Sequence, residues 1–232
     1  MTAGFNIRIR TYFCGFLALW GVSACQQAGK PGKGDSLAMR EAFAESPVLT
    51  ADQSLQAFRL EDGFTAQVVA AEPQVIVPVA MTFDQRGRMW VAEMTGYMPD
   101  TVGTGEDAPN GKIVILEDTN GDGTADTRTV FLDSLVLPRA LAIVGNGLLV
   151  AEPPRLWFIE INNDKPGRKT LVDSLYTEGG NVEHQPNGLL RAMDNWIYSA
   201  KSSKRYRLEN GKWKKEDTHF RGQWGITQDD QG

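Results

Sequence analysis

Short apolar segments alternate with polar turns along most of the chain, and one such unit recurs. Residues 83–93 (FDQRGRMWVAE), 144–152 (VGNGLLVAE) and 192–198 (AMDNWIY) each place an Asp, Asn or Gly turn before a short apolar run. Short apolar runs bounded by Gly, Asn and Asp are typical of β-strands joined by tight turns. Residues 228–232 (QDDQG) resemble the turn of a fourth copy, and no further strand follows them.

The spacing of these copies predicts the fold. Taken as equivalent turn positions, Gly87, Asn146, Asp194 and Gly232 follow one another at intervals of 59, 48 and 38 residues. Irregular repeats of roughly 40–50 residues that consist of short strands are typical of β-propeller blades. No segment after Ala57 has a convincing helical period. We therefore expect an all-β fold, an incomplete β-propeller with about three to four blades covered.

The same reading of apolar and β-branched runs predicts the other elements. A brief helix is a candidate at residues 36–44, and the Glu209-Asn210-Gly211 sequence is a hairpin signal. Further strands are expected at residues 64–70, 75–81, 112–116, 127–132, 156–161 and 169–172. Five tryptophans recur near the strand positions, and they could line a sugar site or pack within the blades: Trp90, Trp157, Trp196, Trp213 and Trp224. We expect them in the core, because aromatic residues in propeller strands usually pack within the blades.

The composition of the chain excludes one class of function and leaves others open. The chain has 232 residues, enough for one sizeable domain, and a formal net charge of −5 with a pI of about 5.2. A nucleic-acid binder needs a basic face, so this balance argues against nucleic acid as a partner. It leaves open a small-molecule enzyme and a protein-binding module.

The N-terminus has the order of features of a bacterial lipoprotein signal. Arg8 and Arg10 precede an apolar stretch at residues 12–22, which is too short to span a bilayer stably. The Val22-Ser23-Ala24-Cys25 sequence resembles a lipobox, in which the signal is cut before the cysteine and the cysteine is lipidated. The alternatives are an ordinary signal peptide cut nearby and a buried cysteine.

This interpretation sets the domain boundaries. We expect a signal peptide at residues 1–24, lipidated Cys25 with a linker at residues 25–57, and the partial propeller at residues 58–232. The mature chain would keep one cysteine, so no internal disulfide could form. Lipid chains on Cys25 would tether it to the bacterial cell envelope, at the periplasmic or outer-membrane face.

Residues 118–126 (DTNGDGTAD) have the spacing of a calcium loop. Oxygen ligands stand at positions 1, 3 and 5, a glycine at position 6 and an acid at position 9. Position 12 is Thr129, so the bidentate glutamate of an EF-hand is absent. The alternative is a solvated Asp/Gly turn. The metal reading assigns a structural Ca²⁺ to Asp118, Asn120, Asp122, Thr124 through its carbonyl, and Asp126.

His184 is the second candidate for chemistry. The chain has two histidines, and this one follows Glu183 and lies ten residues before Asp194. Imidazoles titrate near neutrality and suit general-base work on a hydroxyl group. Glu183 could orient the ring or bind a cofactor. The alternative is a hydrogen-bonding residue of a turn, which is the commoner role of a loop histidine.

The sequence from His184 through Gly188-Leu189 to Asp194-Asn195-Trp196-Ile197-Tyr198 resembles the glucose/sorbosone dehydrogenase family. Residues 58–232, with the 221–227 segment (RGQWGIT), more narrowly resemble membrane-bound dehydrogenase propellers of environmental bacteria. The resemblance implies a six-bladed propeller that holds pyrroloquinoline quinone at its central mouth, with the position of His184 as the base. It also implies a sugar or alcohol substrate and a c-type cytochrome as electron acceptor.

The chain departs from the sugar dehydrogenases in two places. Ser199-Ala200 stands where those proteins commonly have Gly-Asp, and their later cofactor-binding Lys and Arg have no counterpart here. A basic run after the third copy includes Arg205 and Arg207, which could face the anionic quinone. The alternative is a solvated hairpin.

Two functions follow from these observations. The first is an exported, membrane-anchored oxidoreductase that resembles quinone-dependent sugar or alcohol dehydrogenases, with His184 as base and Glu183 assisting. The second is a non-catalytic propeller lipoprotein that binds glycans or a protein partner, because the fold serves both purposes.

Overall fold

The computed structural model describes residues 48–231. The part of the chain from Leu49 onward is one compact unit, and every element named below lies in it. The predicted signal peptide, Cys25, the candidate helix at residues 36–44 and Gly232 lie outside the described residues.

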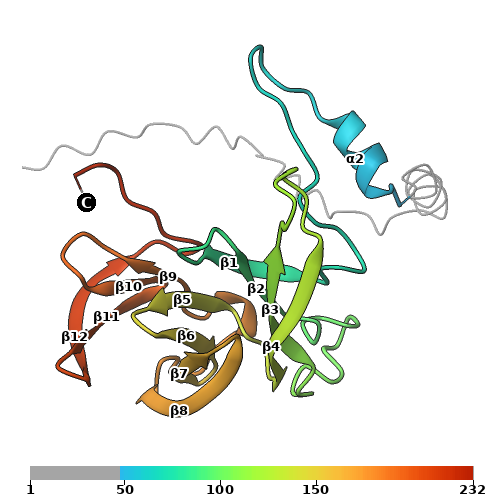
Figure 1. Ribbon diagram of the computed structural model, residues 1–232. Coiled ribbons are helices and arrows are strands. Elements are labelled where there is room, and N and C mark those ends of the chain that lie inside the picture. The colour runs from blue at the N-terminus through green and yellow to red at the C-terminus, as the bar shows by residue number, and fades with distance from the viewer. Residues whose placement is uncertain (1–47, 232) are drawn as a thin grey trace, which may run out of the picture. The chain divides into compact units, whose positions relative to one another are not determined.

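This compact unit contains three four-stranded antiparallel sheets, and each sheet keeps its strands in chain order (Figure 1). The first comprises β1 (Pro78–Phe83), β2 (Met89–Glu93), β3 (Gly111–Glu117) and β4 (Thr127–Leu135). The second comprises β5 (Ala140–Val144), β6 (Gly147–Glu152), β7 (Arg155–Asn162) and β8 (Lys165–Asp173). The third comprises β9 (Asn187–Arg191), β10 (Ile197–Ala200), β11 (Ser202–Glu209) and β12 (Lys212–Arg221). Repeated four-stranded meanders are propeller blades, so the prediction of a partial all-β propeller is confirmed.

The recurring turn joins the first two strands of each sheet. In the first sheet Asp84 Oδ1 accepts the backbone N–H groups of Arg86 and Arg88, at 2.9 and 3.0 Å. In the third, Asp194 Oδ1 accepts the N–H of Trp196 at 3.0 Å. A short carboxylate that satisfies the amides of its own turn fixes the turn without a partner from elsewhere. This explains why Asp opens the repeat in two of its three copies.

The core lies between the sheets, and β6 is buried on both of its faces. Leu148 and Val150 belong to a cluster with the first sheet. Leu149 and Ala151 belong to a second cluster with the third sheet. Successive side chains of a strand point to opposite faces, so a strand buried on both sides needs an unbroken apolar run. The Leu-Leu-Val-Ala sequence meets that need.

The glutamate that ends the Val-Ala-Glu repeat has the same structural task in both copies. Glu93 Oε1 accepts the N–H of Ile76 at 3.0 Å, and its other oxygen pairs with Arg128 at 2.8 Å. Glu152 Oε1 accepts the N–H of Val136 at 3.1 Å. Each carboxylate therefore satisfies a backbone amide of the segment that leads into the first strand of its own sheet.

The segment before the first sheet differs from the prediction. A short helix, α2 (Ala51–Ala57), starts at a capping box in which Thr50 and Gln53 exchange side-chain and backbone hydrogen bonds. The strand predicted at residues 64–70 is wrong, because the segment pairs with no strand and Phe64 is exposed. Within the described part of the chain, no helix is long and apolar enough to cross a membrane.

A short 3₁₀-helix, η1 (Val182–His184), lies in the connection between β8 and β9. It begins at Asn181, whose side-chain oxygen accepts the N–H of Glu183 at 3.0 Å. The first strands of the three sheets, β1, β5 and β9, contact one another in that order, as the innermost strands of adjacent blades do. Their meeting point and η1 form the site described next.

Candidate functional site

A cavity of about 600 Å³ opens where the first strands of the three sheets meet. Val79 and Met81 of β1, Leu141 of β5 and Leu189 of β9 give it apolar walls. Volumes of this order suit a small organic ligand, and apolar walls with a few polar groups are the usual lining of such sites. The polar and aromatic groups of the lining are Tyr97, Arg139, Glu183, Asn187 and Trp224.

The structure places the predicted pair of Glu183 and His184 in η1, at this cavity. Glu183 lies on the cavity wall and His184 lies beside it, about half exposed. His184 Nε2 is 3.6 Å from Glu183 Oε2, and its Nδ1 is 3.0 Å from the side-chain amide nitrogen of Gln223. The imidazole also meets the Trp224 ring edge to face, with 6.0 Å between centroids. The catalytic role of the pair stays a prediction.

Asn187 joins the two segments that carried the family resemblance. Its side-chain amide donates to the Gln223 carbonyl at 2.9 Å, and its side-chain oxygen accepts the N–H of Gly225 at 2.9 Å. Gly188 follows with a φ of +56°, and a Cβ there would lie 3.2 Å from the Gly225 Cα. Glycine is favoured here because a side chain would be strained at this backbone angle and would press on the Gly225 backbone. The motif thus holds the segment that carries Gln223 and Trp224 against β9.

Sequence reasoning missed three residues of this cavity. Arg139 precedes β5 and is buried, and its Nη1 donates to the Val182 carbonyl at 2.6 Å. Burial lowers the pKa of Arg139, and nearby Tyr176, Tyr97 and Glu106 offset part of that effect. Tyr97 follows β2. Trp224 was expected in the core, yet it is exposed at the cavity. A charged residue inside the otherwise apolar 135–142 segment was the available signal for Arg139.

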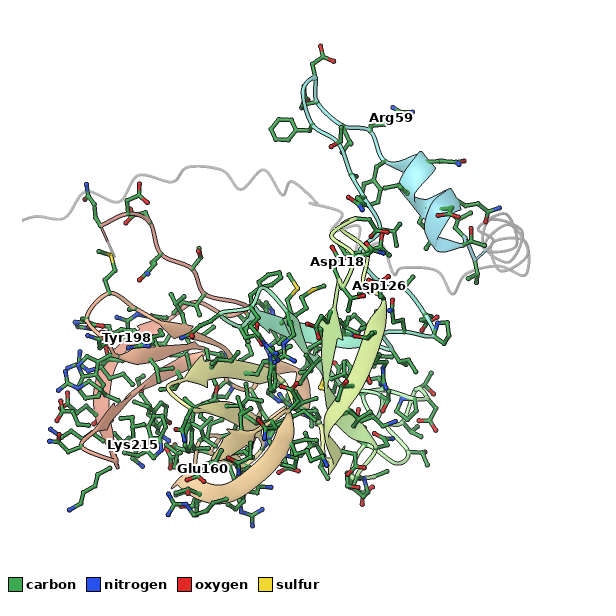
Figure 2. All side chains as sticks on the ribbon, in the orientation of Figure 1. Arg59, Asp118, Asp126, Glu160, Tyr198 and Lys215 are labelled. Atoms are coloured by element: carbon green, nitrogen blue, oxygen red, sulfur yellow. The ribbon has the colours of Figure 1, made fainter. Side chains whose placement is uncertain are left out.

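The predicted calcium loop forms the turn between β3 and β4, and Figure 2 shows Asp118 and Asp126 at its two ends, next to the strands. Asp118 accepts the N–H groups of Gly121 and Gly123, at 2.7 and 2.8 Å. Asp126 accepts the N–H and the hydroxyl of Thr119, at 2.7 and 2.8 Å. The bond from Gly123 is the main reason that the pKa of Asp118 is lowered, and the Thr119 hydroxyl is the main reason for Asp126.

The loop has the donor chemistry of a Ca²⁺ site, because all five predicted ligands offer oxygen. Both carboxylate oxygens of Asp118 and Oδ1 of Asp126 accept one hydrogen bond each and retain a second lone pair, whereas Asp126 Oδ2 accepts two. Among residues 48–231, however, no three His, Cys, Asp or Glu side chains are grouped as metal ligands. The ligand set of Asp118, Asn120, Asp122, Thr124 and Asp126 therefore stays a prediction.

The same loop holds the segment that precedes the first sheet. Gln67 donates to the Asp122 carbonyl at 2.8 Å, and the Ala125 N–H donates to the Val69 carbonyl at 2.8 Å. Gln74 donates to the Ala125 carbonyl at 2.5 Å. The loop thus has a structural task that does not depend on a metal.

Arg205 and Arg207 lie on β11, away from the residues that line the cavity. Both guanidinium groups stack on Trp196, each 4.3 Å from the ring centroid. Arg205 pairs with Glu216 at 2.7 Å, and Arg207 pairs with Glu209. Because both charges are already matched by carboxylates, these residues do not fit the tricarboxylate quinone in this arrangement.

Comparison with protein-family models identifies the chain over most of its length. Residues 50–232 match the family described as Domain of unknown function (DUF7133). The chain belongs to this family. The DUF7133 match covers all twelve strands and the cavity. Comparison with curated proteins gives no match.

Solved structures similar to this DUF7133 protein are β-propellers of low sequence identity. The pyranose dehydrogenase PQQ domain from Coprinopsis cinerea is 11% identical, with a TM-score of 0.46, over 62% of this chain and 32% of that one. A candidate gluconolactonase is 17% identical, with a TM-score of 0.44, over 67% and 53%. Inactive virginiamycin B lyase from Staphylococcus aureus with quinupristin is 15% identical, with a TM-score of 0.37, over 68% and 47%. The chain spans between about a third and about half of these structures.

Proposed function

We propose that this protein is an exported, membrane-anchored oxidoreductase that acts on a hydroxyl group of a sugar or an alcohol. One observation carries the proposal: a carboxylate and an imidazole stand together at the cavity between the innermost strands. Glu183 lies on the cavity wall, and His184 Nε2 lies 3.6 Å from its carboxylate. A base beside a negative charge is suited to take a hydroxyl proton, because the charge stabilises the imidazolium that forms.

Gln223 decides which nitrogen of His184 can act. With its amide nitrogen 3.0 Å from Nδ1, the amide donates to Nδ1, and the ring proton then lies on Nε2. A base at Nε2 requires the opposite arrangement, in which the amide oxygen of Gln223 accepts a proton from Nδ1–H. The two ends of a glutamine amide have nearly the same shape, so a turn of the amide exchanges these tautomers without moving the backbone.

The family resemblance implies that pyrroloquinoline quinone accepts the electrons and that a c-type cytochrome relays them. Arg205 and Arg207 are paired with acids on β11, so we derive no step through the quinone from them. The proposal for this chain is therefore limited to binding the hydroxyl substrate and accepting its proton. It includes a structural Ca²⁺ at residues 118–126.

The proposed place of action is the bacterial cell envelope, at the periplasmic or outer-membrane face. Its support is the order of charge, apolar stretch and Val22-Ser23-Ala24-Cys25 in the sequence. Metabolic labelling with a clickable fatty acid tests it, with Cys25→Ser as the variant that should lose the label. A label retained by Cys25→Ser would refute the anchor.

The catalytic proposal is tested by dye reduction over a panel of sugars and alcohols, with pyrroloquinoline quinone and Ca²⁺ supplied. We expect His184→Ala to lower turnover by about 10²–10⁴-fold, the range for loss of a general base. His219→Ala is the matched control, since this other histidine lies exposed on β12. Turnover that survives in His184→Ala with the wild-type rate would remove His184 from the mechanism.

A binding module is the second candidate, and the contact between the Gln223 amide nitrogen and His184 Nδ1 favours it. With Gln223 donating to Nδ1, His184 is a hydrogen-bonded turn residue with no free lone pair. Trp224 at the cavity mouth also suits stacking on a sugar ring. Glycan binding without turnover, for any substrate or acceptor in the panel, would select this function.

A further inference from the structure

Arg139 is a buried cation that makes no ion pair, and the carboxylate of Glu106 acts on it only through the longer-range electrostatic effect described above. It is 7% exposed, and it follows Pro138 at the start of the innermost strand of the second sheet. Its Nη1 donates to the Val182 carbonyl, but Nε and Nη2 are buried and have no hydrogen-bond partner. None of the ion pairs among residues 48–231 includes Arg139.

A buried charge without an ion pair or a full set of hydrogen bonds lowers the stability of the folded protein. A buried charge is stabilised by an opposite charge or by a full set of hydrogen bonds, and removal of either is strongly unfavourable. The other arginine that is buried in the described part of the chain, Arg88, shows the usual solution, since two aspartates accept from its guanidinium. Arg139 has one carbonyl in their place.

Arg139 lies where an anionic ligand could reach it. It lines the cavity between β1, β5 and β9, where the only other charged side chain of the described lining is Glu183. Glu183 lies beside His184 and makes no ion pair with Arg139. Trp224 and Tyr97 add flat apolar surface on the same walls. The cavity therefore combines an unmatched positive charge with faces that suit a ring.

We propose that this cavity binds a ligand that carries a carboxylate, and that Arg139 is the residue that recognises it. A guanidinium accommodates a carboxylate through two parallel N–H···O bonds, and Arg139 has two N–H nitrogens without acceptors. Lowering of the Arg139 pKa by burial agrees with a site that lacks its anion. The inference deepens the proposed function, because a substrate of this site would be a sugar acid rather than a neutral sugar.

The experiment compares two ligands that differ only in this group. Calorimetry measures the binding of two ligands, without quinone and without dye. One is the methyl glycoside of D-galacturonic acid, whose carboxylate is free, and the other is methyl D-galactoside. We expect the acid to bind about 10- to 100-fold more tightly than the neutral sugar, which is the usual worth of a charge-assisted hydrogen bond. Equal affinities for the two sugars would overturn the assignment of a sugar acid, and together with no Arg139-dependent binding in the quinone titration below they would overturn the carboxylate site itself.

Variants then assign the preference to Arg139. Arg139→Gln keeps a side-chain N–H donor and removes the charge, and we expect it to lose the preference for the acid. Its melting temperature should equal or exceed that of the wild type, because a buried unmatched charge has been removed. Arg168→Gln is the control, since this exposed arginine pairs with Glu160 on the second sheet. An unchanged preference in Arg139→Gln would overturn the assignment.

A third titration, with pyrroloquinoline quinone alone, identifies the source of the carboxylate. Arg139-dependent binding of the quinone and not of the sugar acid would still support a carboxylate site, with the cofactor as its ligand. Because the readout is binding, it separates the two proposals. A protein that binds the acid through Arg139 and oxidises nothing keeps this inference and loses the oxidoreductase function.

Discussion

Arg88 and Asp164 form a two-point ion pair that joins the first and second sheets. Nη1 lies 2.7 Å from Oδ2, and Nη2 lies 2.7 Å from Oδ1. Arg88 directly precedes β2, and Asp164 lies in the turn between β7 and β8. Asp84 accepts from Nε of the same guanidinium at 2.8 Å. The planar fork of arginine can meet both acids at once, which a lysine ammonium cannot do with the same geometry.

Arg88→Lys should therefore destabilise the protein although the charge is kept. We expect a loss of about 2–3 kcal/mol in the free energy of unfolding, below the full value for a buried pair because Asp164 is partly exposed. Urea denaturation measures it. Arg86→Ala is the control, since Arg86 reaches the same aspartate from the surface and should cost about 0.5 kcal/mol or less. Equal losses would show that geometry at Arg88 is unimportant.

Asp173 should make stability depend on pH in the acid range. Burial opposes its ionisation, but bonds from the Leu175 amide, Tyr206 and Lys215 outweigh burial, and the pKa of Asp173 is lowered. A lowered pKa in the folded state means that this stabilisation is complete above the unfolded value of about 3.9 and is lost as pH falls through the folded value.

Tyr206→Phe tests the sign of that effect. The Tyr206 hydroxyl donates to Asp173 Oδ2 at 2.9 Å, so its removal should raise the pKa of Asp173 and move the acid loss of stability to higher pH. Unfolding free energies measured from about pH 6 to about pH 2 show the shift. The exposed Asp133→Asn serves as control. A curve that moves to lower pH would contradict the account.

Calcium should raise the melting temperature through the loop at residues 118–126. A ligand that binds only the folded state at a concentration 100 times its Kd adds about 2.7 kcal/mol. We expect Asp118→Asn to abolish the rise and Asp107→Asn, in another loop, to keep it. Scanning calorimetry with and without chelator measures both. An identical rise in the two variants would place the ion elsewhere.

Gly188→Ala should disturb the cavity more than Gly145→Ala, although the two glycines have the same backbone conformation. Gly188 and Gly145 have φ angles of +56° and +58°, so alanine should cost each about 1 kcal/mol in backbone strain. Only at Gly188 would the new methyl group press on Gly225, while Gly145 has nothing within 4 Å. We expect Gly188→Ala alone to shift the fluorescence of exposed Trp224. The same spectral change in both variants would refute this.

Local sequence patterns predicted the sheets well because the interactions that fix each hairpin turn are made within the turn itself. The turn that starts with Asp84 and the one at Asp194 close on their own backbone amides, so a short window of sequence contains the cause of the structure. The segment at residues 64–70 shows the opposite case. Its alternation is that of a strand, but no partner strand lies beside it, and pairing is a property of the whole fold.

The candidate site was predicted only in part for the same reason. Glu183 and His184 are adjacent in sequence, so their proximity needed no fold. Arg139 and Gln223 are 45 and 39 residues from His184 along the chain. The bonds of Asn187 bring the Gln223 segment to the ring, and the packing of β5 beside β9 brings Arg139 to the same cavity. The spacing of Arg205 and Arg207 likewise gave no sign that Glu216 and Glu209 would match their charges.

The burial of β6 on both faces also governs the order in which the protein can come apart. Leu148 and Leu149 are consecutive residues, yet they belong to the two different clusters. An opening of this strand would break both clusters together, so the middle sheet cannot melt while its neighbours remain intact. Partial unfolding is left to the two outer sheets, and the amide hydrogens of β6 should exchange with solvent only when the whole assembly is lost.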